Sequence, residues 1–369
     1  MSNLTRPKID QKSHSLHLTL LGVVALVALS CLLAEAKGGK TSSSGPNQQT
    51  YLVSDVPDVS PLQDTNLITA WGISFSSNSP FWISANGTGL AKVYCVTNDS
   101  LGAPHVANVG LEVAIPGNGN ITGQVCNNTS AFNGDQFLFA SDDGTISGWR
   151  PALIFAAETL VSRSSADYKG ITIVPSTAAT SAMLLAANFS EGTVDVYDGN
   201  MNLVGQYSDP NAPAGYAPYN VQMAAGKIFV TFAKQDATKH NVVTGPGYGL
   251  IDIFVLSTHT FQRFASGSNA GGKLSIINAP WGVALAPSNF GSHGGQLLFG
   301  NHGSGTIMAF TTSGSSQGQL TSGKSPVVIN GLFGLSFGNG ASAGVPGILY
   351  YTAGPNNGGN HGLFGQIKP

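Results

Sequence analysis

Charged side chains are scarce in this sequence, and their scarcity argues against two classes of protein. Only 9% of the 369 residues are Asp, Glu, Lys or Arg, and the net charge is −2. A typical domain has about a quarter of its residues charged. Broad binding of nucleic acid needs a basic face, which so few cations do not supply. A long disordered chain would be poor in apolar residues, whereas 42% of this chain is hydrophobic. The composition therefore favours a folded protein without a nucleic-acid partner.

Cysteine is also rare, with three residues in the chain: Cys31, Cys95 and Cys126. No C-x-x-C, H-E-x-x-H or clustered Cys/His pattern occurs, so the sequence predicts no structural zinc site. Cys95 and Cys126 could pair in an oxidising compartment. They fall in different sequence repeats, and the sequence leaves their pairing open.

Helix-type periodicity and nucleotide-binding motifs are missing as well. After the N-terminal segment, no apolar 3.6-residue pattern runs longer than about ten residues. Glycine is abundant, at 48 residues, which disfavours helices. No P-loop, dinucleotide fingerprint or G-x-S-x-G elbow occurs in a fitting context. The sequence indicates an all-β fold and identifies no enzyme class.

The first 36 residues have the layout of a secretory signal peptide. Basic residues precede an apolar run over 18–33, and Ala34-Glu35-Ala36 follows as a cleavage pattern. The run is shorter than the about 20 residues of a membrane span, although a retained single-span anchor is the alternative. We therefore expect export to the periplasm or the extracellular space, a flexible linker over 37–50, and a single domain over 51–369. That domain should have no membrane contact once the signal is removed.

The expected domain is built from a repeat of about 50 residues. Each copy opens with a short apolar phrase, usually with Gly second, and continues with a hairpin rich in Val, Ile, Phe and Tyr. The opening phrases start near residues 72, 123, 170, 220, 282 and 334. Six such units predict a six-bladed β-propeller of four-stranded antiparallel blades, with glycine where strands crowd the axis. An irregular β-sandwich is the alternative.

The two ends of the repeat complement each other. The last copy has three strand-like segments, over 333–337, 347–353 and 361–367, whereas residues 51–55 form a strand without a unit. Pairing them would remove two exposed sheet edges. The sequence therefore predicts that the N-terminal strand completes the sixth blade and closes the ring.

Several long phrases resemble a known family of exported bacterial proteins whose function is uncharacterised. They are YLVSDVP (51–57), NLITAWGISF (66–75), DGTISGW (143–149), DPNAPAGYAPYNVQ (209–222), AKQDATKH (233–240), APWGVALAPSNFG (279–291) and YTAGPNNGGNHGLFG (351–365). The resemblance covers about 50–369, and it extends more loosely to six-bladed NHL-like and SMP-30-like propellers. It implies a propeller fold and export. It implies no activity, since fold-level likeness does not carry function.

Antiparallel topology predicts where a site would lie. Residues just before the first strand of each blade and residues in the hairpin tips should converge on one face around the axis. The candidates for ligand binding are Asn66, Asn220, Asn278, Asn330, Asp142, Asn301 and His361. The hairpin tips also supply Asn86, Asp143, Asn188, Glu191, His302 and Asn356. Such oxygen donors suit hydroxyl-rich ligands or Ca²⁺, although Asn and Asp are also ordinary turn residues.

The hairpin tip of the fourth unit is unusually long, over 234–249. It gathers Lys234, Asp236 and His240, of which Asp236 or His240 could act as a general base while Lys234 binds an anion. A solvated insertion is the alternative. Trp71, Trp281 and Phe333 occupy equivalent positions and are expected to pack at the axis, with an aromatic sugar platform as the second interpretation.

These observations support two functions. The favoured one is an exported binding module whose polar axial face and long loop bind a small ligand, a glycan or a protein. We expect this module to be monomeric. The alternative is a hydrolase or lyase dependent on a Ca²⁺-type metal at the axis. Neutral Asn side chains hold divalent ions weakly, so the sequence favours binding.

Overall fold

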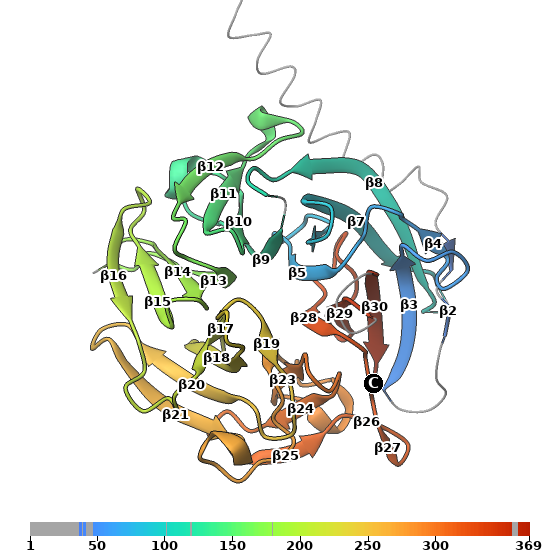
Figure 1. Ribbon diagram of the computed structural model, residues 1–369. Helices are drawn as coiled ribbons and strands as arrows, with labels where there is room; N and C mark the ends of the chain where they lie inside the picture. Colours follow the sequence, from blue (N-terminus) through green and yellow to red (C-terminus); the bar gives the residue numbers. More distant parts are fainter. Residues whose placement is uncertain are drawn as a thin grey trace, which may run out of the picture.

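The repeating units form six four-stranded antiparallel sheets set around a central axis, as the computed structural model shows (Figure 1). The structure describes residues 37–38, 40–41, 47–100, 102–118, 120–178, 180–355 and 361–369. The expected signal peptide, residues 1–36, lies outside the described residues. The predicted all-β, six-bladed propeller is confirmed.

The first three blades follow one another along the chain, each with its strands in sequence order from the axis outward. Blade 1 consists of β5 (Ala70–Ser74), β6 (Phe81–Ala85), β7 (Leu90–Asn98) and β8 (Pro104–Ala114). Blade 2 consists of β9 (Ile121–Cys126), β10 (Phe137–Ser141), β11 (Thr145–Trp149) and β12 (Glu158–Ser162). Blade 3 consists of β13 (Tyr168–Val174), β14 (Met183–Asn188), β15 (Thr193–Tyr197) and β16 (Leu203–Tyr207).

The last three blades repeat the pattern, and the sixth takes one strand from the start of the domain. Blade 4 consists of β17 (Tyr216–Ala224), β18 (Lys227–Gln235), β20 (Leu250–Val255) and β21 (Thr260–Ser266). Blade 5 consists of β22 (Pro280–Leu285), β23 (Leu297–Asn301), β24 (Ile307–Phe310) and β25 (Ser316–Gln319). Blade 6 consists of β28 (Leu332–Phe337), β29 (Leu349–Ala353), β30 (Leu363–Lys368) and β3 (Gln48–Ser54).

Shorter elements decorate the ring. The additional strands are β1 (Lys37–Gly38) beside β8, β2 (Lys40–Thr41) and β4 (Leu62–Gln63) beside β3, β19 (Val242–Val243) beside β18, and the β26 (Thr321–Ser322) and β27 (Ser325–Pro326) pair. The described residues form four 3-10 turns, η1 (Phe132–Gly134), η2 (Pro151–Leu153), η3 (Ser268–Ala270) and η4 (Gly291–His293). No helix among them has the length and hydropathy of a membrane span.

The ring closes through the pairing of β3 with β30. Tyr51 lies opposite Gly365 and Ser54 opposite Leu363, in antiparallel register (Figure 1). The predicted closure by the N-terminal strand is therefore confirmed. The strand begins at Gln48, three residues before the expected boundary, because its pairing with β30 extends to Lys368. The expected linker, residues 37–50, thus overlaps β3 and also contains β1 and β2.

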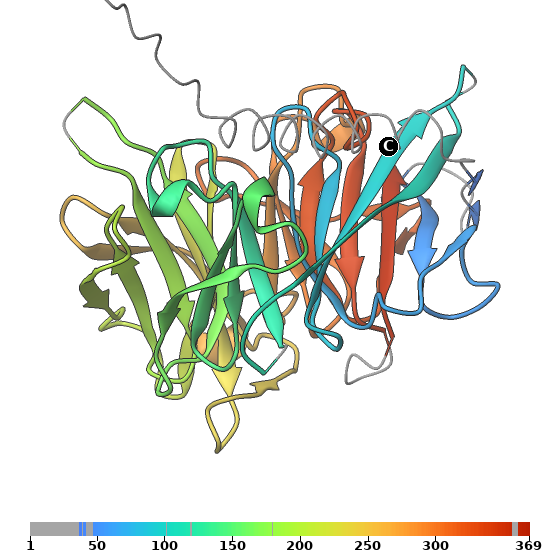
Figure 2. The same cartoon turned by 90° about the horizontal axis from the view of Figure 1, so that it is seen from above.

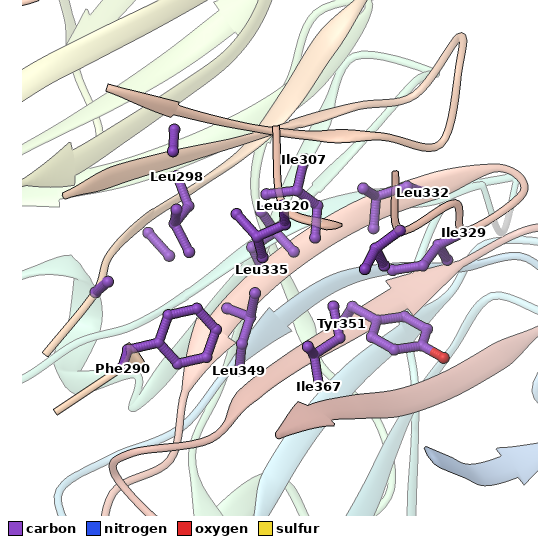
Figure 3. Packing of buried hydrophobic residues seen from close by; sticks show 14 of the residues in the cluster. Phe290, Leu298, Ile307, Leu320, Ile329, Leu332, Leu335, Leu349, Tyr351 and Ile367 are labelled. Carbon is purple, nitrogen blue, oxygen red and sulfur yellow. The ribbon is translucent and has the colours of Figure 1, made fainter. Parts of the chain in front are cut away.

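Burial explains the composition of the strands. The second strand of a blade lies between neighbouring blades, so β10 is buried at every position, whereas the outer strand β16 is largely exposed. Between blades 5 and 6, Leu298 and Ile307 pack against Leu335 and Leu349 (Figure 3). Such inter-blade layers, rather than one central core, supply the apolar burial that stabilises the ring.

Glycine sits where inner strands of neighbouring blades approach most closely. A Cβ on Gly123 would lie 2.6 Å from Gly170 Cα, and one on Gly282 would lie 2.4 Å from the Phe333 carbonyl oxygen. Five of the six inner strands carry Gly at this position: Gly72, Gly123, Gly170, Gly282 and Gly334. The crowding expected at the axis is therefore the reason for the glycine in the repeat.

The cysteines do not bridge the repeats. Cys126, at the end of β9, is a free thiol, so a Cys95–Cys126 disulfide is not formed. Burial raises the pKa of Cys126 to about 11, which leaves the thiol protonated near neutral pH.

Candidate functional site

A cavity of about 560 Å³ opens at one end of the axis. The starts of inner strands contribute Trp71, Lys169, Tyr219 and Phe333, and the hairpin tips contribute Asn86, Asp142 and His302. The β18–β20 connection, yellow in Figure 2, projects from one face of the ring. Its residues 240–242 and 244 complete the wall. The cavity thus forms where antiparallel topology places both kinds of segment on one face.

Aromatic rings form the floor of this cavity. Trp71 stacks on Phe333 with ring centroids 3.9 Å apart, and it meets Trp281 edge to face at 6.3 Å. Tyr219 joins the same buried cluster. A second cavity of about 300 Å³ lies on the other side, and Trp281 lines that one. The two cavities share no lining residue among those described, so the aromatic cluster separates them.

The floor contains a hydrogen-bond donor without an acceptor. Trp71 is only 9% exposed, and its indole N–H has no partner among the described residues. Buried N–H groups are normally paired, because an unpaired one loses its hydration. The indole N–H of Trp71 is therefore an unsatisfied donor buried in the floor of the cavity.

One wall carries a chain of side-chain contacts that links blade 3 to the long loop of blade 4. Asp167 is fully buried, with Oδ1 2.7 Å from Lys169 Nζ and Oδ2 3.0 Å from His240 Nδ1. On the far side of Lys169, Asp142 Oδ2 lies 3.9 Å from the ammonium. Burial raises the pKa of Asp167 and of Asp142, while the Lys169 charge opposes the rise in both.

His302 contributes a neutral imidazole to the opposite side. Its ring stacks on Phe333 at 4.3 Å, and Nδ1 lies 3.3 Å from the Leu332 carbonyl oxygen, which only accepts. Burial lowers the pKa of His302 to about 4, so the ring is uncharged at neutral pH. The proton then resides on Nδ1, and Nε2 is a hydrogen-bond acceptor.

This assignment predicts a specific dependence of stability on pH. Between pH 6.5 and about 4, the unfolded chain protonates His302 and the folded chain does not, so acid favours unfolding. Relative to a His302→Gln variant, the native protein should lose about 2 to 3 kcal/mol of unfolding free energy between about pH 7 and about pH 4.5. Urea unfolding of both proteins at the two pH values measures this. If the difference in unfolding free energy between the native protein and His302→Gln is the same at both pH values, the neutral state assigned to His302 is wrong.

The structure gathers some of the expected site residues and disperses the others. Asp142, Asn330 and His240 line the axial cavity together with Asn86 and His302. Asn220 lines the second axial cavity instead, where its amide donates to the Trp281 carbonyl at 2.8 Å. Asn66 is exposed, on the loop before β5.

Two more of these asparagines stabilise turns. Asn278 is buried and accepts a hydrogen bond from the Gly245 N–H at 2.7 Å, which holds the long loop in place. Asn301 is also buried, and its Oδ1 accepts from the Asn278 N–H at 2.9 Å. The side-chain oxygens of both residues are thus occupied by backbone donors, which is the ordinary role of asparagine in turns.

Three other candidates are also engaged outside the cavity lining. His361 Nδ1 lies 2.8 Å from Asp55 Oδ2, at the junction of β3 and β30. Lys234 stacks over Tyr248 with its ammonium 4.4 Å from the ring centroid. Asp236 accepts hydrogen bonds from Thr238 within the loop, and these bonds lower its pKa. Asn356 lies outside the described residues.

The sequence interpretation missed Asp167 and Lys169. Both flank the opening phrase of the third repeat, and charged residues at that point are uncommon in a chain with so few charges. That rarity was the one available signal. The described residues contain no group of three or more His, Cys, Asp or Glu that could hold a metal ion. A calcium ion in this cavity would have the Asp142 carboxylate and otherwise neutral oxygens, such as those of Asn86 and Asn330.

Comparison with known proteins supports the fold and assigns no activity. No family model matches the chain. One uncharacterised protein of Acanthamoeba polyphaga mimivirus is 30% identical over 265 residues, which cover 67% of this chain and 62% of that protein. A second uncharacterised mimivirus protein is 28% identical over 270 residues, which cover 67% of each. The chain thus spans less than two thirds of the first relative. These relatives are viral, so they give no support to the bacterial origin that the family resemblance implies.

Solved structures with the same fold include an enzyme and a binding protein. Virginiamycin B lyase from Staphylococcus aureus aligns with a TM-score of 0.50 and 12% identity, over 82% of this chain and 95% of its own. An auxiliary nutrient binding protein from Bacteroides thetaiotaomicron aligns with a TM-score of 0.50 and 13% identity, over 90% of this chain and 76% of its own. At such identities the likeness shows the β-propeller fold alone.

Proposed function

We propose that this chain is an exported β-propeller that binds a small, neutral, hydroxyl-rich molecule in its axial cavity. The observation that carries the proposal is the buried, unpartnered indole N–H of Trp71 on an aromatic floor. The cavity volume of about 560 Å³ lies within the range of about 300 to 1,000 Å³ typical of small-ligand sites.

The chemistry of the lining matches hydroxyl groups, which both donate and accept. Trp71 and Lys169 are donors, whereas the Asp142 carboxylate and the free nitrogen of His302 are acceptors. The aromatic floor offers apolar ring atoms to the C–H groups of a sugar-sized ring. A hydroxylated ring therefore satisfies more of the lining than an apolar molecule would.

Charge favours a neutral ligand over an anion. Lys169, the cation that lines the cavity, already forms an ion pair with Asp167 and has Asp142 3.9 Å away. An added anion would meet the field of both carboxylates. The aromatic floor and amide-bearing walls also support a sugar-sized ligand better than an extended protein partner.

A Trp71→Phe substitution tests the proposal. Phenylalanine keeps a ring against Phe333 and removes the N–H, so we expect affinity to fall about tenfold, with a lower melting temperature because ring volume is lost from the buried cluster. Calorimetric titration with D-glucose, D-galactose, D-mannose, D-xylose and N-acetylglucosamine measures this against the native protein.

A matched control is Trp149→Phe. The Trp149 N–H donates to the Ile154 carbonyl at 3.0 Å, away from the axial cavity, so this variant should bind the same sugar with unchanged affinity. Absence of saturable binding by the native protein, or equal affinity of Trp71→Phe and native protein, would contradict the proposal.

A further inference from the structure

We propose that the axial cavity hydrolyses esters of its hydroxylated ligand, with His240 as general base and Lys169 at the ester carbonyl oxygen. The inference rests on the proposed function for the place and the class of ligand. It adds a reaction, and it requires no metal ion or cofactor.

Asp167 fixes the orientation of His240. A carboxylate only accepts hydrogen bonds, so the contact of 3.0 Å between Asp167 Oδ2 and His240 Nδ1 places the ring proton on Nδ1. The lone pair of Nε2 is then available to take a proton. The His240 side chain is 59% exposed and lines the cavity, which gives water and substrate access to this nitrogen. Asp167 is a positioning residue in this arrangement.

Lys169 differs in one respect from the other blade cations that contact acids. Four of them each have two carboxylates within 3.0 Å: Lys92 with Asp64 and Glu112, Arg150 with Asp135 and Glu158, Arg163 with Asp195 and Glu191, and Arg263 with Asp209 and Asp252. In each of these clusters two acids lie close to one cation.

Lys169 has one carboxylate at 2.7 Å, and its second lies 3.9 Å away, beyond hydrogen-bond distance. An ammonium carries three N–H donors, so donor capacity remains on the side of the cavity. That position suits a hydrogen bond to the carbonyl oxygen of a neutral ester, because a donor already held in place by Asp167 needs no reorganisation to contact that oxygen.

The reaction needs no co-reactant other than water. A water molecule attacks the ester carbonyl carbon and gives one proton to His240 Nε2, while the carbonyl oxygen becomes an oxyanion facing Lys169. When the oxyanion re-forms the C=O bond, the C–O bond to the alcohol breaks. The departing alkoxide takes the proton from the His240 imidazolium. One water is consumed, and a carboxylic acid and an alcohol are formed.

The test uses 4-nitrophenyl acetate as a chromogenic ester and the full chain. His240→Gln should lower kcat/KM at least about 100-fold, the usual contribution of a positioned base. Asp167→Asn should lower kcat with KM unchanged and should alter the pH–rate profile, because it removes the charge that orients the imidazole. A purely structural role for Asp167 would not change that profile.

His361→Gln is the matched control. His361 has the same kind of contact, 2.8 Å from Asp55, but it does not line the axial cavity, so its loss should leave the rate unchanged. Equal rates for native protein and His240→Gln, or an equal loss in His361→Gln, would overturn the inference. Sugar titration of His240→Gln separates the two proposals. If His240→Gln still binds sugar and hydrolyses the ester as fast as the native protein, the proposed reaction is rejected and the proposed binding stands. If hydrolysis depends on His240 but the native protein binds no sugar, the proposed class of ligand is rejected.

Discussion

A Leu52→Asp substitution should open the propeller and remove its cooperative unfolding. Leu52 is fully buried on β3, the strand that joins the start of the domain to β30 at its end. A carboxylate there would have no partner in the apolar layer between blades 6 and 1. We expect a loss of about 4 kcal/mol or more, a lower melting temperature and oligomers formed through the exposed edge of β30.

Circular dichroism during heating measures the melting temperature. Size-exclusion chromatography with light scattering measures the oligomers. Val59→Asp is the control, since Val59 is 36% exposed on the loop after β3 and a charge there should be tolerated. A peptide of residues 47–55 added to the Leu52→Asp protein should partly restore the melting temperature. A variant that melts as the native protein does would show that closure contributes little to stability.

Gly123→Ala should have the second largest effect on stability. The added methyl carbon would lie 2.6 Å from Gly170 Cα and 2.9 Å from the Ile171 nitrogen, both of them backbone atoms of the next blade. Backbone atoms at the axis can move only if the inner strands of blades 2 and 3 separate. We therefore expect a loss of about 2 to 3 kcal/mol in unfolding free energy by urea titration.

Gly199→Ala provides the comparison for this substitution. Gly199 lies in the turn between β15 and β16, and its nearest obstacle is the Ala131 side chain at 3.1 Å. The cost there should be below about 1 kcal/mol, the usual range for surface positions. Equal effects of the two substitutions would mean that the axis is not the crowded point of the repeat.

The fold could be predicted from the sequence because its determinants are periodic. Glycine recurs at this point in five of the six inner strands. The exception, Asn220, places its side chain against the inner strand of the next blade, where its amide donates to the Trp281 carbonyl oxygen. The missing fourth strand of the last repeat likewise identified the strand over residues 51–55 as its partner. Both signals can be read from short stretches of sequence and from the number of strands in each repeat.

The site could be predicted only as a face of the ring. The contact between His240 and Asp167 joins residues 73 positions apart in different blades, and no local pattern encodes it. Asn278 and Asn301 were expected to face a ligand, yet their oxygens accept backbone N–H groups that hold the turns. Sequence alone does not tell which asparagine serves its own turn and which serves a ligand.

Among the described residues, the aromatic cluster at the axis closes the inner end of the axial cavity. Because Trp71, Tyr219 and Phe333 close its floor, a molecule that enters between the hairpin tips leaves by the same route. Arriving and departing molecules then share the face of the ring from which the loop that carries His240 projects. A ligand is therefore held at one end of the axis and does not pass along it. The rate of exchange at that face of the ring sets an upper limit on any turnover inside the cavity.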